Sequence, residues 1–392
     1  MATVIPFAKA APAPAAIVEA PYLRTRAERL AAGKALRASM ARSAHAKVFT
    51  GKRDVVALLQ ESNQGRLGHL VPIRYGRMMF SPFAFLRGSA AVMAHDLGRL
   101  PHSAVHTQLC GDCHLNNFGG YASPERELLF GINDFDETLP GPFEWDVKRL
   151  ATSFVVAARN QGITERDCLE AARMVARSYR TRMTEYSAVR ALDLWYAKVE
   201  VNTLVQLSKS PQTRRRREKM LHDAQRRNSS VAFEKLVERR GSALRFIDQP
   251  PLIYHPKGND EFHDGVRAFF KHYVGTLPEE RKKLLDHFRL VDVAVKVVGV
   301  GSVGTRCAIA LLMADDDDPL ILQFKEARPS VLEPYAGASA YHNSGLRVTV
   351  GQRLMQAYSD IFLGFSRLAR RWIAAGSGCD AAVDTVAGPD GG

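Results

Sequence analysis

Residues 109–119 read LCGDCHLNNFG. This short stretch is compatible with three different chemistries. Its two cysteines and the histidine that follows them form C-x-x-C-H, the signature by which a c-type haem is attached. The cysteines alone are typical of half a zinc site or of a redox pair. Asp112, His114 and Asn117 also have a D-x-H-x-x-N spacing that is used for phosphate transfer, so the rest of the chain has to distinguish these interpretations.

The cysteine count argues against haem and zinc. The chain has five cysteines in 392 residues, an odd and sparse set that does not suit a disulfide framework and favours a reducing cytoplasm. Covalent haem attachment belongs to exported proteins, and residues 1–20 have the composition of a flexible tail rather than of an export signal. Zinc would need a second pair of ligands, and Cys168, Cys307 and Cys379 stand alone in the sequence.

Composition and charge define the class of protein. Hydrophobic residues make up 46% of the chain and charged residues 24%, as in globular proteins with a large core. No apolar run approaches the roughly 18 residues of a membrane span, so we expect a cytoplasmic protein. The net charge of +13 attracts phosphate-bearing partners, and Arg74, Arg77 and Arg87 are candidates to contact them. Arg214–Arg217 have no interleaved aromatic side chains, so we do not expect a nucleic-acid partner.

The apolar patterning predicts a helix-rich α+β protein. The run LLFGI at 128–132 is typical of a strand, a helix is expected from about Trp145 to Gly162, and residues 164–245 are polar and helical in pattern. From about residue 288 the runs become β-branched and aliphatic, which predicts three strands separated by a glycine loop and an acidic turn. We expect four segments: a disordered tail (1–20), a mostly helical lobe with the catalytic-type and metal-type loops (21–287), a glycine-loop β-lobe with a closing helix in 347–375 (288–375), and a second disordered tail (376–392).

Three polar side chains supply what phosphate transfer needs. Catalysis of this reaction consists mainly of positioning and of neutralising charge. Asp112 can accept the proton of an attacking hydroxyl, while Asn117 and Asp134 offer oxygen ligands to Mg²⁺. One short predicted hairpin separates their loops, so the loops can meet at neighbouring strand ends. Taken alone, Asp112 and Asn117 also fit a loop stabilised by its own side chains.

The same residues resemble a known catalytic loop. Gly111–Asn117, GDCHLNN, is similar to the G-D-x-H-x-x-N loop of the aminoglycoside and choline phosphotransferases, which are small-molecule relatives of the protein kinases. In that family a hairpin leads to an I-D-[FW] metal aspartate, and Ile132–Phe135, INDF, resembles it with one extra residue. A following D-P-x-x-D-L-A segment is echoed by Gly141–Val147, GPFEWDV, where Asp146 would brace the catalytic loop from the start of a helix.

This resemblance implies a role for each residue. Asp112 would be the catalytic base, and His114 would support its loop. Asn117 and Asp134 would hold Mg²⁺, and Asp136 would serve a second metal ion.

Gly299, Gly301 and Gly304 form G-x-G-x-x-G after an apolar run. Glycines let main-chain N–H groups approach phosphates, and two folds use the pattern in this way. In a kinase, strand–loop–strand covers ATP and a lysine on the third strand reaches the phosphates, a position that suits Lys325. In a dinucleotide-binding unit, strand–loop–helix holds the cofactor, with an acidic residue about 20 positions later, which suits Glu326. Periodicity leaves both folds open, together with a tight structural turn.

The kinase-like catalytic loop makes a kinase-like glycine loop its natural partner. Kinases place the glycine loop first, whereas here it follows the catalytic loop by about 180 residues. Active-site geometry is set in space and not by chain order. We therefore predict a protein-kinase-like α+β fold with a rearranged order of lobes.

Longer matches point to a bacterial family. The stretch from about residue 50 to 365 is identified as a member of domain of unknown function 2252 by LVPIRYGRMMFSPFAFLRG, LCGDCHLNNFGGY, NDFDETLPGPFEWDVKRLATS, VGVGSVGTRC, LQFKEARPSVLEPY and GQRLMQAYSDIFLGF. Members carry a block with Tyr, Arg and Lys after the LGF-like segment. Here ARRWIAAGSGCDAAVDTVAGPDGG stands in its place, which implies a truncated or divergent member.

We therefore expect an ATP-binding, magnesium-dependent transferase that acts on a small molecule. Gly299, Gly301 and Gly304 would cover the phosphates of ATP, and Lys325 would bind them. Two alternatives remain. One is a non-catalytic nucleotide-binding or regulatory protein of the same fold, which the divergent C-terminal sequence favours. The other is a dinucleotide-binding oxidoreductase, which a helix directly after Gly304 would support and a strand would oppose.

Overall fold

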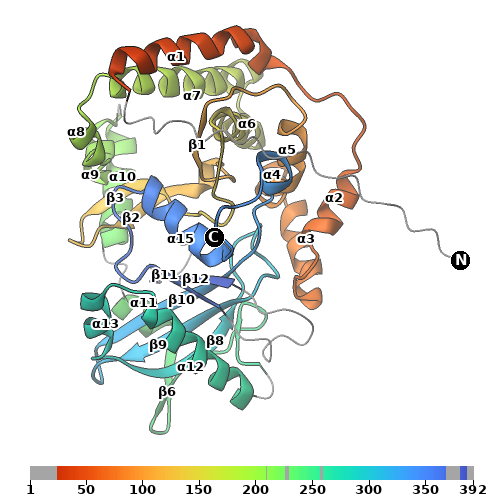
Figure 1. Cartoon of the computed structure of the whole chain (residues 1–392). Coiled ribbons are helices and arrows are strands. Elements are labelled where there is room, and N and C mark those ends of the chain that lie inside the picture. Colours follow the sequence, from red (N-terminus) through yellow and green to blue (C-terminus); the bar gives the residue numbers. More distant parts are fainter. Residues whose placement is uncertain (1–23, 209, 226–228, 257–258, 368–379, 386–392) are drawn as a thin grey trace, which may run out of the picture.

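The computed structural model describes residues 24–208, 210–225, 229–256, 259–367 and 380–385 (Figure 1). It has a mixed α+β fold in which helices predominate. The tail expected at residues 1–20 lies outside the described residues. Among the helices of the described ranges, none combines the length and the apolar character that crossing a bilayer requires.

Helices form most of the first 225 residues. They are α1 (Arg26–Ser39), α2 (Val55–Ser62), α3 (Val71–Met79), α4 (Pro82–Gly88), α5 (Ala90–Leu97), α6 (Glu144–Asn160), α7 (Glu165–Tyr186), α8 (Ala191–Trp195), α9 (Val201–Gln206) and α10 (Pro211–Gln225), with 3₁₀ turns η2 (Arg42–Ala46), η3 (Gly68–Leu70) and η4 (Leu115–Asn117). The helix expected from about Trp145 is α6. It ends before Gly162, which has a φ of +70°, and Thr164 caps the following α7 by accepting from the N–H of Asp167.

Two small antiparallel ribbons lie within this helical half. Their strands are β1 (His106–Leu109) paired with β4 (Leu139–Pro142), and β2 (Phe118–Ala122) paired with β3 (Leu128–Ile132). The predicted run LLFGI is β3, and β2–β3 is the predicted hairpin. Because β1 pairs with β4, the loop that follows β1 is brought beside the loop that follows β3.

A six-stranded antiparallel sheet forms the other half, in the order β11-β12-β10-β9-β8-β7. Its strands are β7 (Ile253–Tyr254), β8 (Arg289–Lys296), β9 (Cys307–Met313), β10 (Pro319–Ala327), β11 (Gly364–Arg367) and β12 (Asp380–Thr385). The three strands predicted after residue 288 are β8, β9 and β10, and the acidic turn joins the last two.

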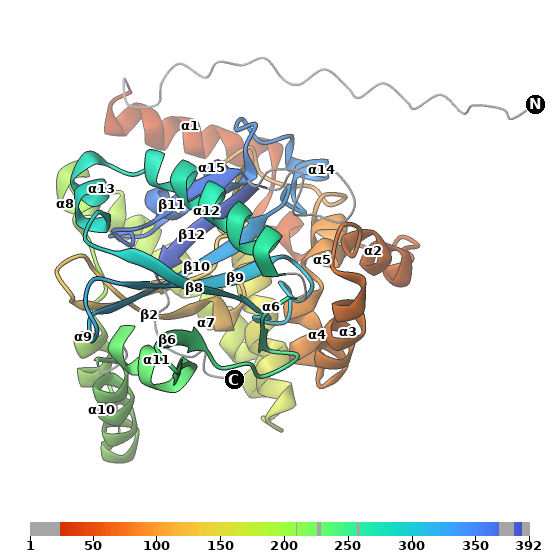
Figure 2. The ribbon, with the colours of Figure 1, turned by 90° about the horizontal axis from the view of Figure 1, so that it is seen from below.

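Both faces of this sheet are buried, which explains its nearly continuous apolar runs. Leu312 and Leu322 face one side, where they pack against α12 (Asn259–Gly275) and α13 (Glu279–Leu285). Leu311 and Ile321 face the other side, against α11 (Ser229–Leu236) and the hairpin of β5 (Val237–Arg240) and β6 (Ala243–Phe246). Figure 2 shows the sheet between these two layers. Helices α11, α12 and α13 and the β5–β6 hairpin, from a segment that we expected in the helical lobe, therefore pack on the sheet.

Three stretches differ from the expected secondary structure. The β5–β6 hairpin falls in the segment expected to be helical, because Gly241 turns the chain at a φ of +62° and the hairpin buries Phe246 against the sheet. In 347–375, helix α15 (Ser344–Met355) ends early and β11 follows. In the expected tail 376–392, β12 pairs with β10 and β11 through main-chain hydrogen bonds, which composition does not register; the other residues of that tail are not described.

The two halves are joined after β10. The chain leaves the sheet through the short helix α14 (Glu333–Ala336) and α15, and both return to the helical half. Leu332 packs with Leu109 and Trp145, while Val348 packs with Cys113 and the end of β10. The loops that follow β1, β3 and β8 consequently lie at the junction of the halves.

Candidate functional site

The loop after β1 is held by one carboxylate. Asp146, in the first turn of α6, accepts from the N–H of Cys110 at 2.8 Å and from the N–H of Gly111 at 3.1 Å. Burial raises the pKa of Asp146 to about 6, against the opposing effect of these two amides. Gly111 has a φ of +85°, and a Cβ there would lie 2.1 Å from the carbonyl oxygen of Glu137. The loop therefore requires glycine, and its sharp turn presents Asp112 to the junction of the halves.

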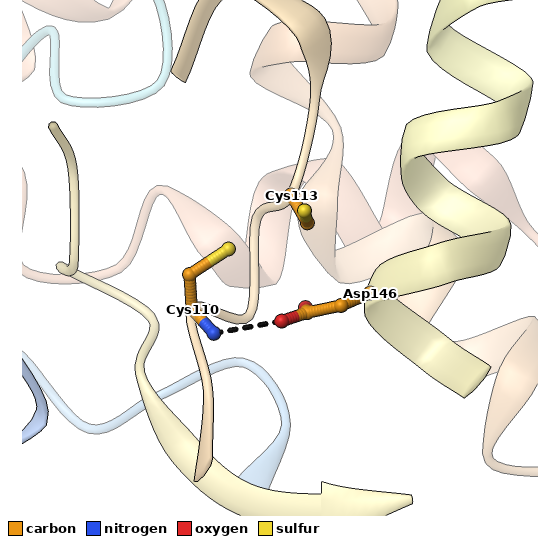
Figure 3. A group of neighbouring side chains, drawn as sticks. All are labelled: Cys110, Cys113 and Asp146. Atoms are coloured by element: carbon orange, nitrogen blue, oxygen red, sulfur yellow. Dashed lines mark hydrogen bonds between the residues drawn. The ribbon is translucent and has the colours of Figure 1, made fainter. Parts of the chain in front are cut away.

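Cys110, Cys113 and Asp146 lie together beside this loop (Figure 3). Their possible ligand atoms are all within 4.8 Å of one another. Both thiols are buried and free, and a hydrogen bond with Cys113 together with burial raises the pKa of Cys110. The two Asp146 oxygens already accept main-chain amides, and in the described part of the chain the group has one ligand fewer than a structural zinc site. The cysteines instead pack the loop against Phe135 and Val348.

Asp112 is fixed through both its side chain and its main chain. Buried Arg149 on α6 forms an ion pair with its Oδ1 and donates to the carbonyl oxygen of Leu86 at 2.8 Å. The side-chain amide of Asn117 donates to the carbonyl oxygen of Asp112 at 2.6 Å. Nε2 of His114 lies 3.8 Å from Oδ2 of Asp112.

His114 is buried, with 4% of its surface exposed. Burial lowers its pKa, so the ring is neutral near pH 7. Its Nδ1 is buried and has no hydrogen-bond partner among the described residues. The ring of Phe83 packs against it edge-on, at 6.5 Å between centroids. These contacts suit a role for His114 in supporting the loop after β1.

The acidic loop after β3 is hydrogen-bonded to the loop after β1, the catalytic-type loop that carries Asp112 and Asn117. The N–H of Asn133 donates to the carbonyl oxygen of Asn117 at 2.8 Å. The N–H of Asp136 donates to Oδ1 of Asp134 at 3.2 Å. The two loops therefore share main-chain contacts as well as a common position at the strand ends.

Arg347 on α15 holds the far side of the acidic loop. Its guanidinium donates to the carbonyl oxygens of Thr138 at 2.5 Å, Asp136 at 2.8 Å and Arg328 at 2.7 Å. The side chain is 1% exposed. A single buried cation thus joins the acidic loop to the segment after β10. Sequence reasoning did not single out this residue, because no local pattern marks it.

Asp136 in the acidic loop has a raised pKa. Burial and the neighbouring charge of Asp134 raise its pKa to about 7, while the charge of Lys325 opposes this shift. The hydroxyl of Ser302 in the glycine loop donates to its Oδ2 at 3.3 Å. Asp136 therefore connects the acidic loop to the glycine loop and is within electrostatic range of Lys325 on β10.

The glycine loop joins β8 to β9. Gly299 and Gly304 have φ values of +64° and +87°, and a Cβ on Gly301 would lie 3.3 Å from the carbonyl oxygen of Arg87. These two strands are antiparallel neighbours in the sheet. The connection is therefore strand–loop–strand, and no helix follows Gly304 as a dinucleotide-binding unit would require.

Contacts with the α2–α4 region hold this loop over the helical half. Arg66 donates to the carbonyl oxygen of Val303 at 2.7 Å, and the N–H of Leu67 donates to that of Gly304 at 2.8 Å. Arg77 donates to the carbonyl oxygen of Gly299. The loop is thereby anchored at both ends.

A cavity of about 160 Å³ lies where the three loops meet. The sequence-predicted residues that line it are Asp112, His114, Asn117, Asp134, Asp136, Gly299 and Gly301. Gly304 and Lys325 do not line it. Gly304 packs against Arg66, and Lys325 lies on β10, close enough to Asp136 for its charge to affect that carboxyl.

All three loops lie within the part of the chain that matches a known protein family. The family model described as "Uncharacterized protein conserved in bacteria (DUF2252)" matches residues 66–375. The chain belongs to this DUF2252 family. No curated protein and no solved structure matches the chain. The family match contains every loop that lines the cavity.

Arginines also line the cavity of this DUF2252 protein. Arg66 and Arg328 were not singled out from the sequence, whereas Arg74 and Arg87 were. Three of these arginines donate hydrogen bonds to neutral carbonyl oxygens. Arg66 donates to those of Ser62 and Val303, and Arg328 donates to those of Ser62 and Gln64. Arg74 donates to the side-chain oxygen of Asn63 and to the main-chain oxygen of Gly88. Burial and the charges of Arg74 and Arg328 lower the pKa of Arg66 to about 10. One wall of the cavity therefore carries positive charge that its own hydrogen bonds do not neutralise.

Proposed function

We propose that this DUF2252 protein is an ATP- and magnesium-dependent phosphotransferase, kinase-like in its site, that acts on a small molecule. One observation carries the proposal: Asp112, Asn117 and Asp134 line the same cavity as Gly299 and Gly301. The glycine loop is far from the others in sequence, so local proximity does not account for this meeting. A possible base, oxygen ligands and a phosphate-type loop are the parts that phosphoryl transfer uses.

Asp112 is suited to the acceptor side of the reaction. A carboxylate accepts the proton of an attacking hydroxyl when its orientation is fixed. Arg149 fixes the side chain of Asp112, and Asn117 fixes its main chain. His114, neutral and buried, supports the loop without supplying a charge.

The acidic loop is suited to Mg²⁺. Asn117, Asp134 and Asp136 offer the hard oxygen ligands that this ion prefers. Burial, and after it the charge of Asp134, raises the pKa of Asp136, and a cation between the two carboxylates would favour their charged forms. When bound, Mg²⁺ would neutralise charge on the phosphate oxygens.

The glycine loop and β10 are suited to the nucleotide. The antiparallel order β8, loop, β9, turn, β10 is the order in which kinases cover ATP, with Lys325 on the third strand. The arginine wall adds positive potential near the phosphates. The kinase-like arrangement would then be formed with the catalytic-type loop earlier in the chain than the glycine loop.

The alternatives are weaker. A dinucleotide-binding oxidoreductase would have a helix directly after Gly304. The strand β9 follows Gly304 instead and opposes this alternative. A non-catalytic nucleotide-binding protein would have the same cavity, but it would not use Asp112 as a base. The decisive difference is therefore a measurement of turnover.

Calorimetric titration with ATP, with and without Mg²⁺, tests the proposal. We expect saturable binding of Mg-ATP, weakened by about tenfold or more in Asp134→Asn because a metal ligand is lost. Asp112→Asn should bind Mg-ATP within about threefold of the wild type, while release of ADP in an acceptor screen falls by about 100-fold or more. Asp193→Asn, on exposed α8, is the matched control and should change neither quantity.

Each result has a defined consequence. Failure of the wild-type protein to bind Mg-ATP would contradict the proposal. Binding that survives Asp134→Asn would remove the acidic loop from the nucleotide site. Equal ADP release by the wild type and Asp112→Asn would favour the non-catalytic alternative.

A further inference from the structure

Arg87 differs from the other arginines of the cavity in its hydrogen bonding. It lies near the end of α4, is half-buried, and lines the cavity. Its Nε is buried and has no hydrogen-bond partner among the described residues. The Nε of Arg74 is also unpartnered there, but the other two nitrogens of Arg74 donate to Asn63 and Gly88. Within those residues, no carboxylate oxygen approaches its guanidinium to the 4.0 Å of an ion pair. A buried polar atom without a partner is costly, so the position of this side chain calls for an explanation.

The main chain around Arg87 is firmly held. Arg149 donates to the carbonyl oxygen of Leu86 at 2.8 Å, and Arg74 donates to that of Gly88 at 2.7 Å. The carbonyl oxygen of Arg87 itself faces Gly301, where an added Cβ would lie 3.3 Å away, a tight contact. The side chain is thus presented from a fixed backbone, and the same Arg149 also orients Asp112.

Arg87 is within electrostatic range of both carboxylates that we assign to catalysis and to metal binding. Asp112 and Asp134 both act to raise its pKa, although burial outweighs them and lowers it. Arg87 in turn contributes to the lowered pKa of His114. Arg87, Asp112 and Asp134 line the same cavity, and in the described part of the chain Arg87 forms an ion pair with neither carboxylate. An anion placed there would receive several N–H donors in one plane.

We propose that Arg87 is a catalytic residue that contacts the terminal phosphoryl group during its transfer, an inference that rests on the proposed function. The acceptor oxygen attacks the terminal phosphorus of ATP, and the acceptor proton passes to Asp112. The bond from that phosphorus to the bridging oxygen breaks, and ADP leaves with its electron pair. The three non-bridging oxygens carry negative charge throughout, and the N–H groups of Arg87 donate to them. A cation at this place stabilises the transition state more than the ground state.

The test compares the affinity of the protein for Mg-ADP with its affinity for Mg-ADP plus aluminium fluoride, a probe that mimics the transferring phosphoryl group. Wild-type protein should bind the fluoride complex at least about tenfold more tightly than Mg-ADP. In Arg87→Met this gain should disappear, while the Kd for Mg-ADP stays within about threefold. Arg87→Lys, which keeps the charge but not the planar fork, should recover part of the gain. Arg99→Met, whose guanidinium lies over Tyr335 outside the cavity, should behave as the wild type.

The outcomes separate this inference from the proposed function. If the wild type binds Mg-ATP but gains nothing from aluminium fluoride, or if Arg87→Met keeps the gain, the inference is overturned and the nucleotide site stands. Equal loss of Mg-ADP and of the fluoride complex would make Arg87 a general phosphate contact and would also overturn it. If Arg87→Met does not fold, Arg87→Lys is judged by the same two affinities. No binding of Mg-ATP by the wild type would instead defeat the proposed function.

Discussion

Gly111 shows how a single residue controls the shape of the cavity. Its φ of +85° is accessible to glycine at little cost, and the main chain of Glu137 occupies the place of a side chain. The turn at Gly111 lets two successive N–H groups point to Asp146. A side chain there would push the catalytic-type loop and the acidic loop apart.

Gly111→Ala should therefore destabilise the protein by about 3 kcal/mol or more, because it combines an unfavourable φ with a steric clash. The measurement is urea denaturation followed by circular dichroism. Gly33→Ala is the matched control: Gly33 lies inside α1, and a Cβ added there would meet no atom within 4 Å, so it should stabilise the helix by about 1 kcal/mol. A loss for Gly111→Ala no larger than a few tenths of a kcal/mol would contradict the contact with Glu137.

At the scale of elements, His255 connects the strands at one edge of the sheet. Its Nδ1 lies 2.7 Å from Oδ1 of Asp248 after β6, and its Nε2 lies 3.1 Å from Oδ2 of Asp292 on β8. The same Asp292 oxygen accepts from the N–H of Phe246 at 2.7 Å. Burial alone would lower the pKa of His255, but the hydrogen bonds to Asp292 and Asp248 outweigh it and raise the pKa. The pKa values of both aspartates are lowered, despite burial, by the same histidine.

His255→Gln should destabilise the sheet in a pH-dependent way. A raised histidine pKa contributes stability below about 6.5 that is lost as the pH rises through the folded-state value. The lowered aspartate pKa values contribute stability that is lost as the pH falls below about 4. The loss of unfolding free energy should thus be largest near pH 5–6, at about 2 kcal/mol, and smaller at pH 9.

Urea denaturation at pH 5.5 and pH 9 measures this difference. His272→Gln, on an exposed position of α12, is the control and should change stability little at either pH. A cost of His255→Gln that is the same at both values would mean that the histidine is not charged in this link.

At the scale of the whole molecule, the cavity belongs to neither half alone. The helical half supplies the catalytic-type and acidic loops, and the sheet supplies the glycine loop and β10 (Figure 1). Segments after β10 tie them together: the hydroxyl of Ser330 donates to the carbonyl oxygen of Glu137 at 2.8 Å, and the N–H of Val331 donates to Oε2 of Glu137 at 2.7 Å. A ligand in the cavity would therefore contact both halves at once.

Mg-ATP should slow amide hydrogen exchange in both halves together. Near 100 times its Kd, a ligand adds about 2.7 kcal/mol to the stability of the state that binds it. We expect protection in residues 133–137 and in 298–305, which line or border the cavity, and none in the β5–β6 hairpin on the outer face of the sheet. Protection limited to one half would show that the ligand binds outside the junction.

Much of the local structure could be predicted from the sequence. The short apolar run LLFGI and the β-branched and aliphatic runs after residue 288 correspond to β3 and to β8–β10, and the amphipathic run after Trp145 corresponds to α6. The β5–β6 hairpin and β12 were not predicted. Their strands are stabilised by main-chain partners and by Phe246 burying itself on the sheet, and these contacts leave no signal in a short window of sequence.

Residue type and order alone establish which polar groups the loops carry and the spacing of Asp112, His114 and Asn117, because these are local properties. Three-dimensional structure was needed to show that these residues share a cavity with Asp134 and the glycine loop, and that a strand follows Gly304. It also decided the raised pKa of Asp136 and the unpartnered Nε of Arg87 among the described residues. The physical reason is that burial, pairing and electrostatic fields depend on groups that are close in space but distant along the chain.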